Sequence, residues 1–222
     1  MVTAQPRQSA LEMVVRALSL ALIVTGSATA RPVGAGELFV DVAAETGLDF
    51  VHVNGATGRL YFVEMMGGGA ALLDYDGDGD LDVYFSQGDA LTVEAPAEAP
   101  SVSDRLFRND VALDAAGGTV VRWRDVTATA GIPSGGDGVG AATGEGDNAG
   151  DPDGYRPSVG SNRLLINQGD GRFADGTEAS GTDDPRWSVA ASFLDYDGDG
   201  RLDLYVGNYV EYRLATHRDC YS

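Results

Sequence analysis

Apolar and polar residues alternate in short runs along much of the chain, and this two-residue period predicts β-strands. The runs that fit it best are 81–85, 105–108, 120–123, 163–166, 189–194 and 202–206. Beyond residue 30, no long segment carries apolar residues at the three- and four-residue spacing of an amphipathic helix. The pattern therefore predicts an all-β fold.

Three phrases recur and divide the chain into similar units. The first is an aromatic residue with an aspartate two positions later, at Asp41, Asp125 and Asp175. The second is a small-residue run leading into an acidic loop, and these loops begin at Asp74, Glu145 and Asp195. The third is Leu-Phe-Arg-Asn at 106–109 and Leu-Leu-Ile-Asn at 164–167. The last two copies of the first and second phrases are 50 residues apart, so these two units are in register.

Loop and turn signals separate the expected strands. The segment 89–103, rich in Ala, Pro and Glu, is typical of a surface-loop insertion and helps to lengthen the first unit. Asp170-Gly171, between two apolar runs, predicts a hairpin turn. Short antiparallel strands in a repeated cassette favour β-propeller blades over a sandwich. Because propellers have about four to eight blades and residues 31–222 hold roughly three, we expect a partial ring, truncated at its C-terminal end.

The acidic loop at 74–82 has the spacing of a metal site. Its first, third, fifth and ninth positions are Asp74, Asp76, Asp78 and Asp82. Alternate residues of a tight turn point inward, so this spacing converges several oxygens on one point. Asp80, at the seventh position, is expected to bind through its backbone carbonyl, and Gly79 allows the sharp bend.

The loop at 195–203 follows the same plan, with Asp195, Asp197, Asp199 and Asp203 as carboxylates. Arg201 is at its seventh position, which is tolerable only if that position binds through its backbone. An EF-hand needs a glutamate at the twelfth position and flanking helices, but the twelfth positions here are Phe85 and Val206. Oxygen ligands in this number select calcium over zinc or copper. A solvated acidic turn without metal is the alternative, and the repetition of the pattern disfavours it.

The middle loop, 145–153, departs from this plan at two positions. Glu145 is longer than the first aspartate of the other loops, and Ala149 removes the ligand at the fifth position. Asp147, Asp153 and the Asp151 carbonyl remain. We expect a weaker calcium site here.

The charge of the chain supports a cation as its cofactor. There are 34 acidic residues against 15 basic ones, which gives a net charge of −19. Such a field repels phosphate backbones, so nucleic acid is excluded as a partner. Clustered carboxylates also repel one another unless a cation joins them.

The N-terminal segment 1–30 is typical of a Sec-type signal peptide. Arg7 and Arg16 precede the apolar run 17–24, and Ala28-Thr29-Ala30 is a small-residue exit. A membrane anchor is the weaker alternative because the run is shorter than the roughly 20 residues that span a bilayer. We expect cleavage near Ala30, a secreted or periplasmic protein without a membrane span, and a mature domain of residues 31–222.

The acidic loops and the segment 65–71 (Met-Met-Gly-Gly-Gly-Ala-Ala) resemble FG-GAP (VCBS-type) repeats, the units of integrin α-chain propellers. With the segments 52–55, 186–193 and 206–210, nearly all of residues 37–222 is similar to the cartilage acidic protein and ASPIC/UnbV group. The resemblance implies an exported calcium-binding propeller, usually followed by an ASPIC/UnbV domain, and a downstream disulfide partner for Cys220. From the residues alone, a free thiol and a disulfide with a partner outside this chain are equally favoured for Cys220. Glu145 and Ala149 break the family pattern.

The residues offer little for catalysis. Only two histidines, His52 and His217, are present, no nucleophile motif is found, and the metal loops account for many of the carboxylates. We therefore predict a non-enzymatic module, in which calcium stiffens the blade loops and the propeller face meets a protein or glycan ligand, as in cell adhesion. The alternative is the propeller part of a calcium-dependent polysaccharide-active enzyme whose catalytic part lies outside this chain.

Overall fold

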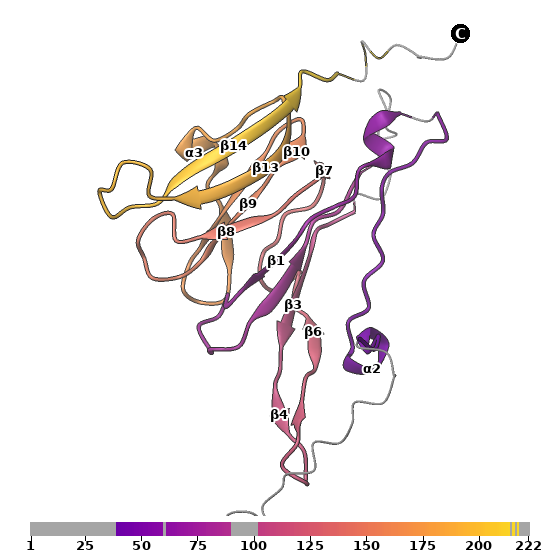
Figure 1. The fold of residues 1–222 in the computed structure, drawn as a ribbon, viewed down its shortest axis with the longest axis vertical. Helices are drawn as coiled ribbons and strands as arrows, with labels where there is room; N and C mark the ends of the chain where they lie inside the picture. Colours follow the sequence, from indigo (N-terminus) through magenta and orange to yellow (C-terminus); the bar gives the residue numbers. More distant parts are fainter. Residues whose placement is uncertain (1–38, 60, 90–101, 214, 216, 218–222) are drawn as a thin grey trace, which may run out of the picture. The chain divides into compact units, whose positions relative to one another are not determined.

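The structure is a computed structural model of the chain, and it describes residues 39–59, 61–89, 102–213, 215 and 217 (Figure 1). The chain divides into two compact units, residues 1–41 and 42–222, and the second unit carries the sheets. The expected signal peptide, Cys220 and residues 90–101 of the expected insertion lie outside the described residues.

The first sheet has four antiparallel strands in the order β1-β2-β3-β6. These strands are β1 (Ala70–Leu73), β2 (Asp82–Phe85), β3 (Arg105–Asn109) and β6 (Trp123–Asp125). A small side hairpin of β4 (Ala112–Leu113) and β5 (Thr119–Val120) interrupts the connection from β3 to β6. The strand expected at 120–123 is therefore wrong: the hairpin takes residue 120, and the last strand of the sheet starts at Trp123.

The second sheet repeats this plan in the order β8-β9-β11-β12. Its strands are β8 (Ala142–Gly144), β9 (Asp153–Arg156), β11 (Arg163–Asn167) and β12 (Phe173–Asp175). The hairpin turn expected at Asp170-Gly171 is confirmed, since β11 and β12 pair across it. A short antiparallel ladder pairs β7 (Asp137–Gly138) with β10 (Ser158–Val159). In sequence, β7 precedes this sheet and β10 lies between β9 and β11.

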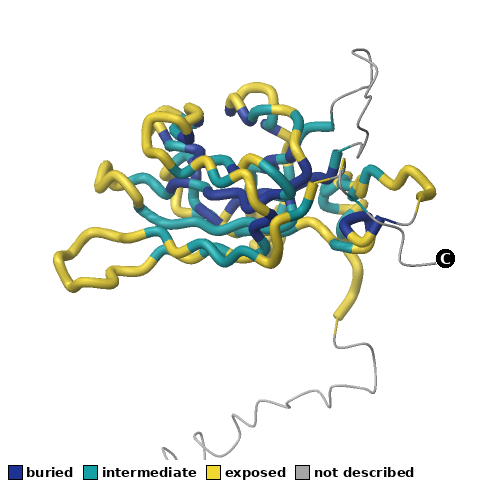
Figure 2. The backbone as a smooth tube through the Cα atoms, turned by 90° about the horizontal axis from the view of Figure 1, so that it is seen from above, coloured by how far each residue is buried: buried dark blue, intermediate teal, exposed yellow. Residues whose placement is uncertain are grey.

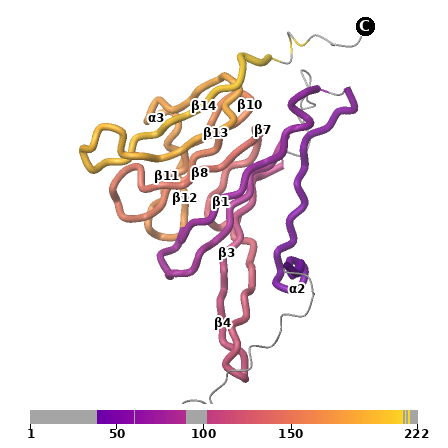
Figure 3. The backbone as a smooth tube through the Cα atoms, in the orientation of Figure 1, coloured from indigo at the N-terminus to yellow at the C-terminus, as the bar shows by residue number. Residues whose placement is uncertain are grey.

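The third sheet consists of β13 (Trp187–Leu194) and β14 (Asp203–Val210), which pair only with each other among the described residues. The first strands of the three sheets, β1, β8 and β13, are neighbours (Figure 3). Glycines permit this approach. A Cβ atom on Gly69 would lie 2.4 Å from the Gly140 carbonyl carbon, and one on Gly144 would lie 2.5 Å from Cγ of Phe193. Glycine is therefore required by packing at Gly69 and Gly144.

The helical elements are single turns. They are α2 (Ala43–Thr46), α3 (Thr177–Ser180) and the 3-10 helix η1 (Phe62–Met65). The helices α2 and α3 lie in the first and last copies of the aromatic-x-Asp phrase, and each ends at a glycine in the left-handed region, Gly47 (φ 86°) or Gly181 (φ 69°). In the middle copy, Gly131 (φ 73°) follows a turn in which the Ala130 N–H donates to the Val126 carbonyl.

The main hydrophobic core lies between the first and second sheets. Leu106 and Phe107 of β3 are almost fully buried, and Leu106 packs in a cluster with Leu165 and Phe173 from the second sheet. Figure 2 shows the buried segments gathered at the centre of the strands and the exposed ones in the loops. A second cluster forms around Trp187 at the start of β13, with Tyr61 and Val63. The first and second sheets therefore bury their apolar faces against each other.

A buried ion pair also joins the first two sheets. Arg156 at the end of β9 and Asp104 before β3 are each 1% exposed, and Nη1 of Arg156 donates to Oδ2 of Asp104 over 2.7 Å. The Tyr84 hydroxyl donates to the same oxygen over 2.5 Å, and the Gln87 N–H donates to Oδ1 over 2.8 Å. Nη2 of Arg156 donates to the Gly135 carbonyl over 3.0 Å. This network fixes the strand ends of both sheets in one arrangement.

Replacing Arg156 should destabilise the protein strongly, because Arg156→Ala leaves the buried Asp104 carboxylate without its counter-charge. We expect a loss of about 3–5 kcal/mol in the free energy of unfolding, measured by urea denaturation. The matched control is Arg163→Ala, whose partner Asp175 is half exposed, and this change should cost less than about 1 kcal/mol. Equal losses in the two variants would contradict a structural role for the buried pair.

Asp137, the first residue of β7, is a second buried charge in this region. It is 8% exposed, and its Oδ2 atom has no hydrogen-bond partner. Burial raises the pKa of Asp137 to about 7. The backbone N–H of Asp89 lowers this pKa, the Asp89 carboxylate raises it, and the Arg156 charge lowers it. At neutral pH the fold therefore opposes ionisation of this carboxyl group.

Asp137 should make the unfolding free energy depend on pH. Its folded-state pKa is above the ordinary value of 3.8, so its contribution to stability is fully present below about pH 4 and is lost as the pH rises to about 7. Asp137→Asn should lack this loss. Relative to wild type, the variant should gain up to about 4 kcal/mol between pH 4 and pH 8 in urea denaturation. Asp170→Asn, at an exposed position, is the control. Parallel pH profiles for wild type and Asp137→Asn would contradict the assignment.

Candidate metal centre

The three acidic loops occupy equivalent places in the fold. Each connects the first two strands of a sheet: 74–82 joins β1 to β2, 145–153 joins β8 to β9, and 195–203 joins β13 to β14. The repeat inferred from the sequence therefore corresponds to a repeated hairpin with an acidic turn.

In the first loop, the carboxylates of Asp74, Asp76 and Asp78 gather around one point. Each offers an oxygen, and these oxygens all lie within 4.8 Å of one another. The Asp74 carboxylate is held by the turn itself, since Oδ1 accepts the Asp78 N–H over 3.1 Å and Oδ2 accepts the Gly79 N–H over 3.0 Å. Oδ1 of Asp78 accepts the Asp80 N–H over 2.9 Å. The backbone thus orients the carboxylates before any ligand is considered.

The third loop repeats the three hydrogen bonds described for the first loop. Asp195, Asp197 and Asp199 also offer oxygens within 4.8 Å of one another. Oδ1 of Asp195 accepts the Asp199 N–H over 3.1 Å, and Oδ2 accepts the Gly200 N–H over 3.0 Å. Oδ1 of Asp199 accepts the Arg201 N–H over 2.8 Å. Two segments 121 residues apart in sequence therefore form the same group of ligands.

Left-handed backbone at two positions of each loop allows this geometry. The sixth-position glycine, expected from the sequence, has a φ of 92° in Gly79. The fourth position also has a positive φ in all three loops, in Gly77, Asn148 and Gly198. The sequence reasoning missed this second requirement, although a glycine at the fourth position of both regular loops indicates it. Asparagine tolerates this region better than other side chains do, which explains how the middle loop keeps the turn.

The middle loop brings together Glu145, Asp147 and Asp153, whose oxygens lie within 4.8 Å of one another. Asp153 is fully buried, whereas Asp147 is exposed. Oδ1 of Asp147 accepts the Ala149 N–H over 2.9 Å. No first-position aspartate is present to accept the N–H groups of the turn, and Oε1 of Glu145 is buried without a hydrogen-bond partner. This loop also gathers three carboxylates, but they come from its first, third and ninth positions.

The ninth-position aspartate has a separate structural role in the first loop. Asp82 is 0% exposed; its Oδ2 accepts the Tyr75 N–H over 3.0 Å, and its Oδ1 accepts the Asn109 N–H of β3 over 2.8 Å. Burial raises the pKa of Asp82 to about 6, although the hydrogen bonds from Asn109 and Tyr75 lower it. Asp82 thus closes its own loop and ties that loop to the third strand.

Several residues expected to act at these sites lie outside the three groups of converging oxygens. They are the ninth-position residues of the regular loops and the seventh-position residues of all three, namely Asp82, Asp203, Asp80, Asp151 and Arg201. The role expected of the seventh position, through its backbone carbonyl, stays a prediction. In each of the two regular loops, the structure gathers the first, third and fifth carboxylates.

The acidic groups fit a hard cation. Burial raises the pKa of Asp76, and repulsion from the nearby Asp78 carboxylate raises it further. Oδ1 of Asp76 is buried without a hydrogen-bond partner, and Nη1 of Arg108 lies 3.7 Å from the other oxygen, Oδ2. A cation in the loop would satisfy the orphaned oxygen and offset this repulsion.

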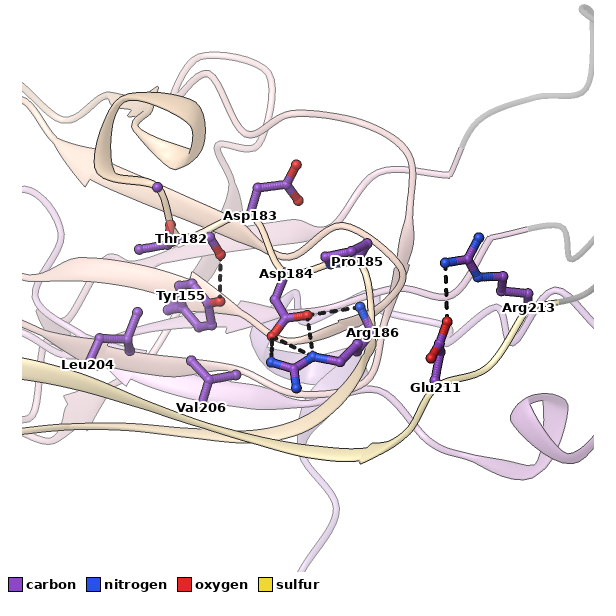
Figure 4. Close-up of a pocket in the computed structure, with 11 residues that line it drawn as sticks. Tyr155, Thr182, Asp183, Asp184, Pro185, Arg186, Leu204, Val206, Glu211 and Arg213 are labelled. Atoms are coloured by element: carbon purple, nitrogen blue, oxygen red, sulfur yellow. Dashed lines mark hydrogen bonds and ion pairs between the residues drawn. The ribbon is translucent and has the colours of Figure 1, made fainter.

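A separate cleft of about 640 Å³ lies between the second and third sheets, away from the acidic groups. Figure 4 shows Tyr155 of β9 facing Leu204 and Val206 of β14, with Asp184 and Arg186 beside them in the lining. The Tyr155 hydroxyl donates to the Thr182 carbonyl over 3.1 Å. The ion pair with Arg186 holds the pKa of Asp184 well below its ordinary value. The wall on the β14 side is apolar.

These features define a protein built of successive β-sheets, each with an acidic hairpin between its first two strands. The sequence family described as FG-GAP-like repeat matches residues 147–206, from the middle loop through the second sheet to β14. The chain therefore contains an FG-GAP-like repeat at these residues. No curated protein matches the chain. Within the described residues, no helix is long and apolar enough to cross a membrane.

Removing the ninth-position carboxylate should destabilise the first sheet with or without calcium. Asp82→Ala leaves the buried Tyr75 N–H and the partly buried Asn109 N–H without an acceptor, so we expect a loss of about 2–4 kcal/mol in urea denaturation. Asp80→Ala is the matched control, because the Asp80 side chain lies outside the group of converging oxygens, and it should cost less than about 0.5 kcal/mol. A loss for Asp82→Ala that appears only in calcium buffer would instead make this residue solely a ligand.

Proposed function

We propose that the acidic hairpins bind calcium and that the protein is a calcium-stabilised interaction module built from FG-GAP-like repeats. The observation that carries this proposal is the buried, unpartnered Oδ1 atom of Asp76 within a group of three converging carboxylates. The FG-GAP-like match to residues 147–206 supports it, because such repeats often bind calcium.

Calcium suits these ligands for a chemical reason. It takes six to eight oxygen ligands in flexible geometry, and carboxylates and backbone carbonyls are the groups that these loops offer. In the first site, Asp74, Asp76 and Asp78 would hold the ion. In the third site, Asp195, Asp197 and Asp199 would do so. The bound charge would neutralise the acidic turn and stiffen the hairpin.

The arrangement of sheets supports a propeller. The first strands of three successive sheets are neighbours, and two complete sheets have the same four-strand order. A ring of such sheets places strand-connecting loops on shared faces, which are common binding surfaces. We propose that one face of such a ring binds a protein or glycan ligand, in adhesion or a related contact.

We also propose that the protein is exported and belongs to the cartilage acidic protein and ASPIC/UnbV group. The signal-like segment 1–30 and the resemblance over residues 37–222 support this assignment. FG-GAP repeats are typically extracellular, where calcium is abundant enough for weak sites to be filled.

Calorimetric titration of the protein with calcium should count its sites. We expect two sites in the wild type with dissociation constants on the order of 0.1–1 mM, and a weaker third site in the middle loop. Asp78→Ala and Asp199→Ala should each remove one of the two tighter sites, because each deletes one of three carboxylates. Ala149→Asp should strengthen the third site, and Asp170→Asn, at an exposed position outside the loops, should leave the count unchanged.

Thermal unfolding gives an independent test. At 10 mM calcium, each site of this affinity should stabilise the fold by about 1.4–2.7 kcal/mol, so the melting temperature should rise by several degrees. A chelator should reverse the rise. Equal melting with calcium and with chelator would sink the calcium proposal.

A further inference from the structure

The third strands of the two complete sheets share a sequence pattern that the calcium proposal does not use. It is Arg-Leu-apolar-x-Asn, where β3 supplies the apolar residue as Phe107 and β11 supplies it as Leu165. In both sheets the leucine pairs with a tyrosine of the second strand: Leu106 with Tyr84, and Leu164 with Tyr155.

The asparagine that ends this pattern fastens the strand to the acidic hairpin. In the first sheet, the Asn109 N–H donates to Oδ1 of Asp82 over 2.8 Å, and its side-chain Nδ2 donates to the Leu81 carbonyl over 3.1 Å. The second sheet repeats both bonds, at 2.8 and 3.3 Å, with Asn167, Asp153 and Pro152. The ninth-position aspartate and the carbonyl before it therefore recognise one asparagine in each sheet.

The third sheet contains the same two acceptors, but no third strand lies against them among the described residues. Oδ2 of Asp203 accepts the Tyr196 N–H over 2.9 Å, as the other two ninth-position aspartates accept an N–H from their own loops. Oδ1 of Asp203, however, accepts no hydrogen bond from a described residue. Asp203 is exposed, whereas Asp82 and Asp153 are 0% exposed.

The tyrosine of the third sheet shows the same contrast. Tyr205 lies two positions after Asp203, as Tyr84 lies two positions after Asp82. Tyr84 is 7% exposed and Tyr155 is 2% exposed, but Tyr205 is 68% exposed. The edge of β14 away from β13 has no partner strand among the described residues.

The cleft beside β14 matches the remaining apolar side chain of the pattern. In the second sheet, Leu165 pairs with Gly154 and packs against the first sheet. Leu204 occupies the position of Gly154 in the third sheet and, with Val206, lines the 640 Å³ cleft that faces Tyr155 (Figure 4). An apolar side chain on a strand paired with β14 in the same register would enter this cleft.

We propose that the free edge of β14 binds an extended strand of the pattern Arg-Leu-apolar-x-Asn, a repeat strand of the same kind as β3 and β11. The strand would pair antiparallel with β14, place its apolar residue in the cleft and place its leucine against Tyr205. Its asparagine would donate its backbone N–H to Oδ1 of Asp203 and its side-chain amide to the Leu202 carbonyl. Main-chain pairing supplies affinity at such an edge, and the side-chain contacts supply specificity.

This recognition does not depend on the identity of the bound metal. A second copy of β14 fits the edge less well, since the segment 203–210 has its single asparagine, Asn208, in the interior of the strand and already bonded to Ser188 and Asp184. The pattern of β3 and β11 fits at three of its specified positions, namely the leucine, the apolar residue and the asparagine.

Fluorescence anisotropy with a labelled synthetic peptide tests the proposal. The probe has the sequence of residues 161–176, which contains the pattern and its following turn. We expect saturable 1:1 binding to the full chain. The same peptide with Asn167→Ala should bind at least about fivefold more weakly, because it loses the side-chain hydrogen bond. This comparison requires no change to the protein.

The protein variants locate the binding edge. Asp203→Asn should weaken binding about fivefold or more, because one acceptor oxygen is replaced by an NH₂ group, while Asp170→Asn should bind as the wild type does. This pair also excludes exchange of the peptide with β11, which would be insensitive to Asp203. Each titration is repeated in calcium and in chelator, so that a failure of the calcium proposal shows in the buffer comparison and not in the peptide comparison.

Three results would overturn the proposal. They are the absence of binding to the wild type, equal binding of the Asn167→Ala peptide, and equal binding by Asp203→Asn. Dimers of the chain that are disrupted by Tyr205→Asp, measured by analytical ultracentrifugation, would show instead that β14 pairs with its own copy.

Discussion

The fold depends on a carboxylate that is buried so that it can hold backbone together. Asp82 has both oxygens bonded to main-chain N–H groups, one in its own turn and one in the third strand of the sheet. Asp153 does the same in the second sheet. Without this carboxylate, the N–H groups of a tight acidic turn and of an interior strand would be buried without acceptors, which costs more than most side-chain contacts contribute. The first and second sheets are therefore each organised around the end of their first hairpin.

The turn that is closed by Asp82 also brings like charges together. The turn that presents Asp82 to the strands also places Asp74, Asp76 and Asp78 around one point, and their repulsion is inherent in the geometry. A hard cation is the simplest partner for such a group, because it neutralises the charge and accepts oxygens from several directions. Structural anchoring and the proposed binding of calcium thus fall to different positions of this loop. In the first loop the ninth position holds the sheet, and the carboxylates of the first, third and fifth positions converge on one point.

Contacts between the sheets add a second level of organisation. The Asp104–Arg156 pair, the close approach at Gly69 and the shared core around Leu106 all join the first sheet to the second. The third sheet has only its first two strands among the described residues, and its aspartate, tyrosine and cleft are correspondingly open. The comparison of three copies of one unit therefore shows which contacts belong to the hairpin and which to the completed sheet.

The sequence by itself determined the local structure. Two-residue alternation located most strands to within a few residues, and the Asp-x-Asp-x-Asp-Gly spacing located the carboxylates that converge, since both depend on neighbours in the chain. The predicted strand at 120–123 is wrong, because an inserted hairpin rather than β-propensity decides the pairing there. The spacing of the acidic loops also predicts that Asp82 and Asp203 are equivalent calcium ligands. Only the tertiary structure distinguished them, because burial of Asp82 and exposure of Asp203 depend on whether a strand from elsewhere in the chain lies against the hairpin. The same reason hides the Asp104–Arg156 pair from the sequence, since its partners are 52 residues apart and meet only when two sheets pack.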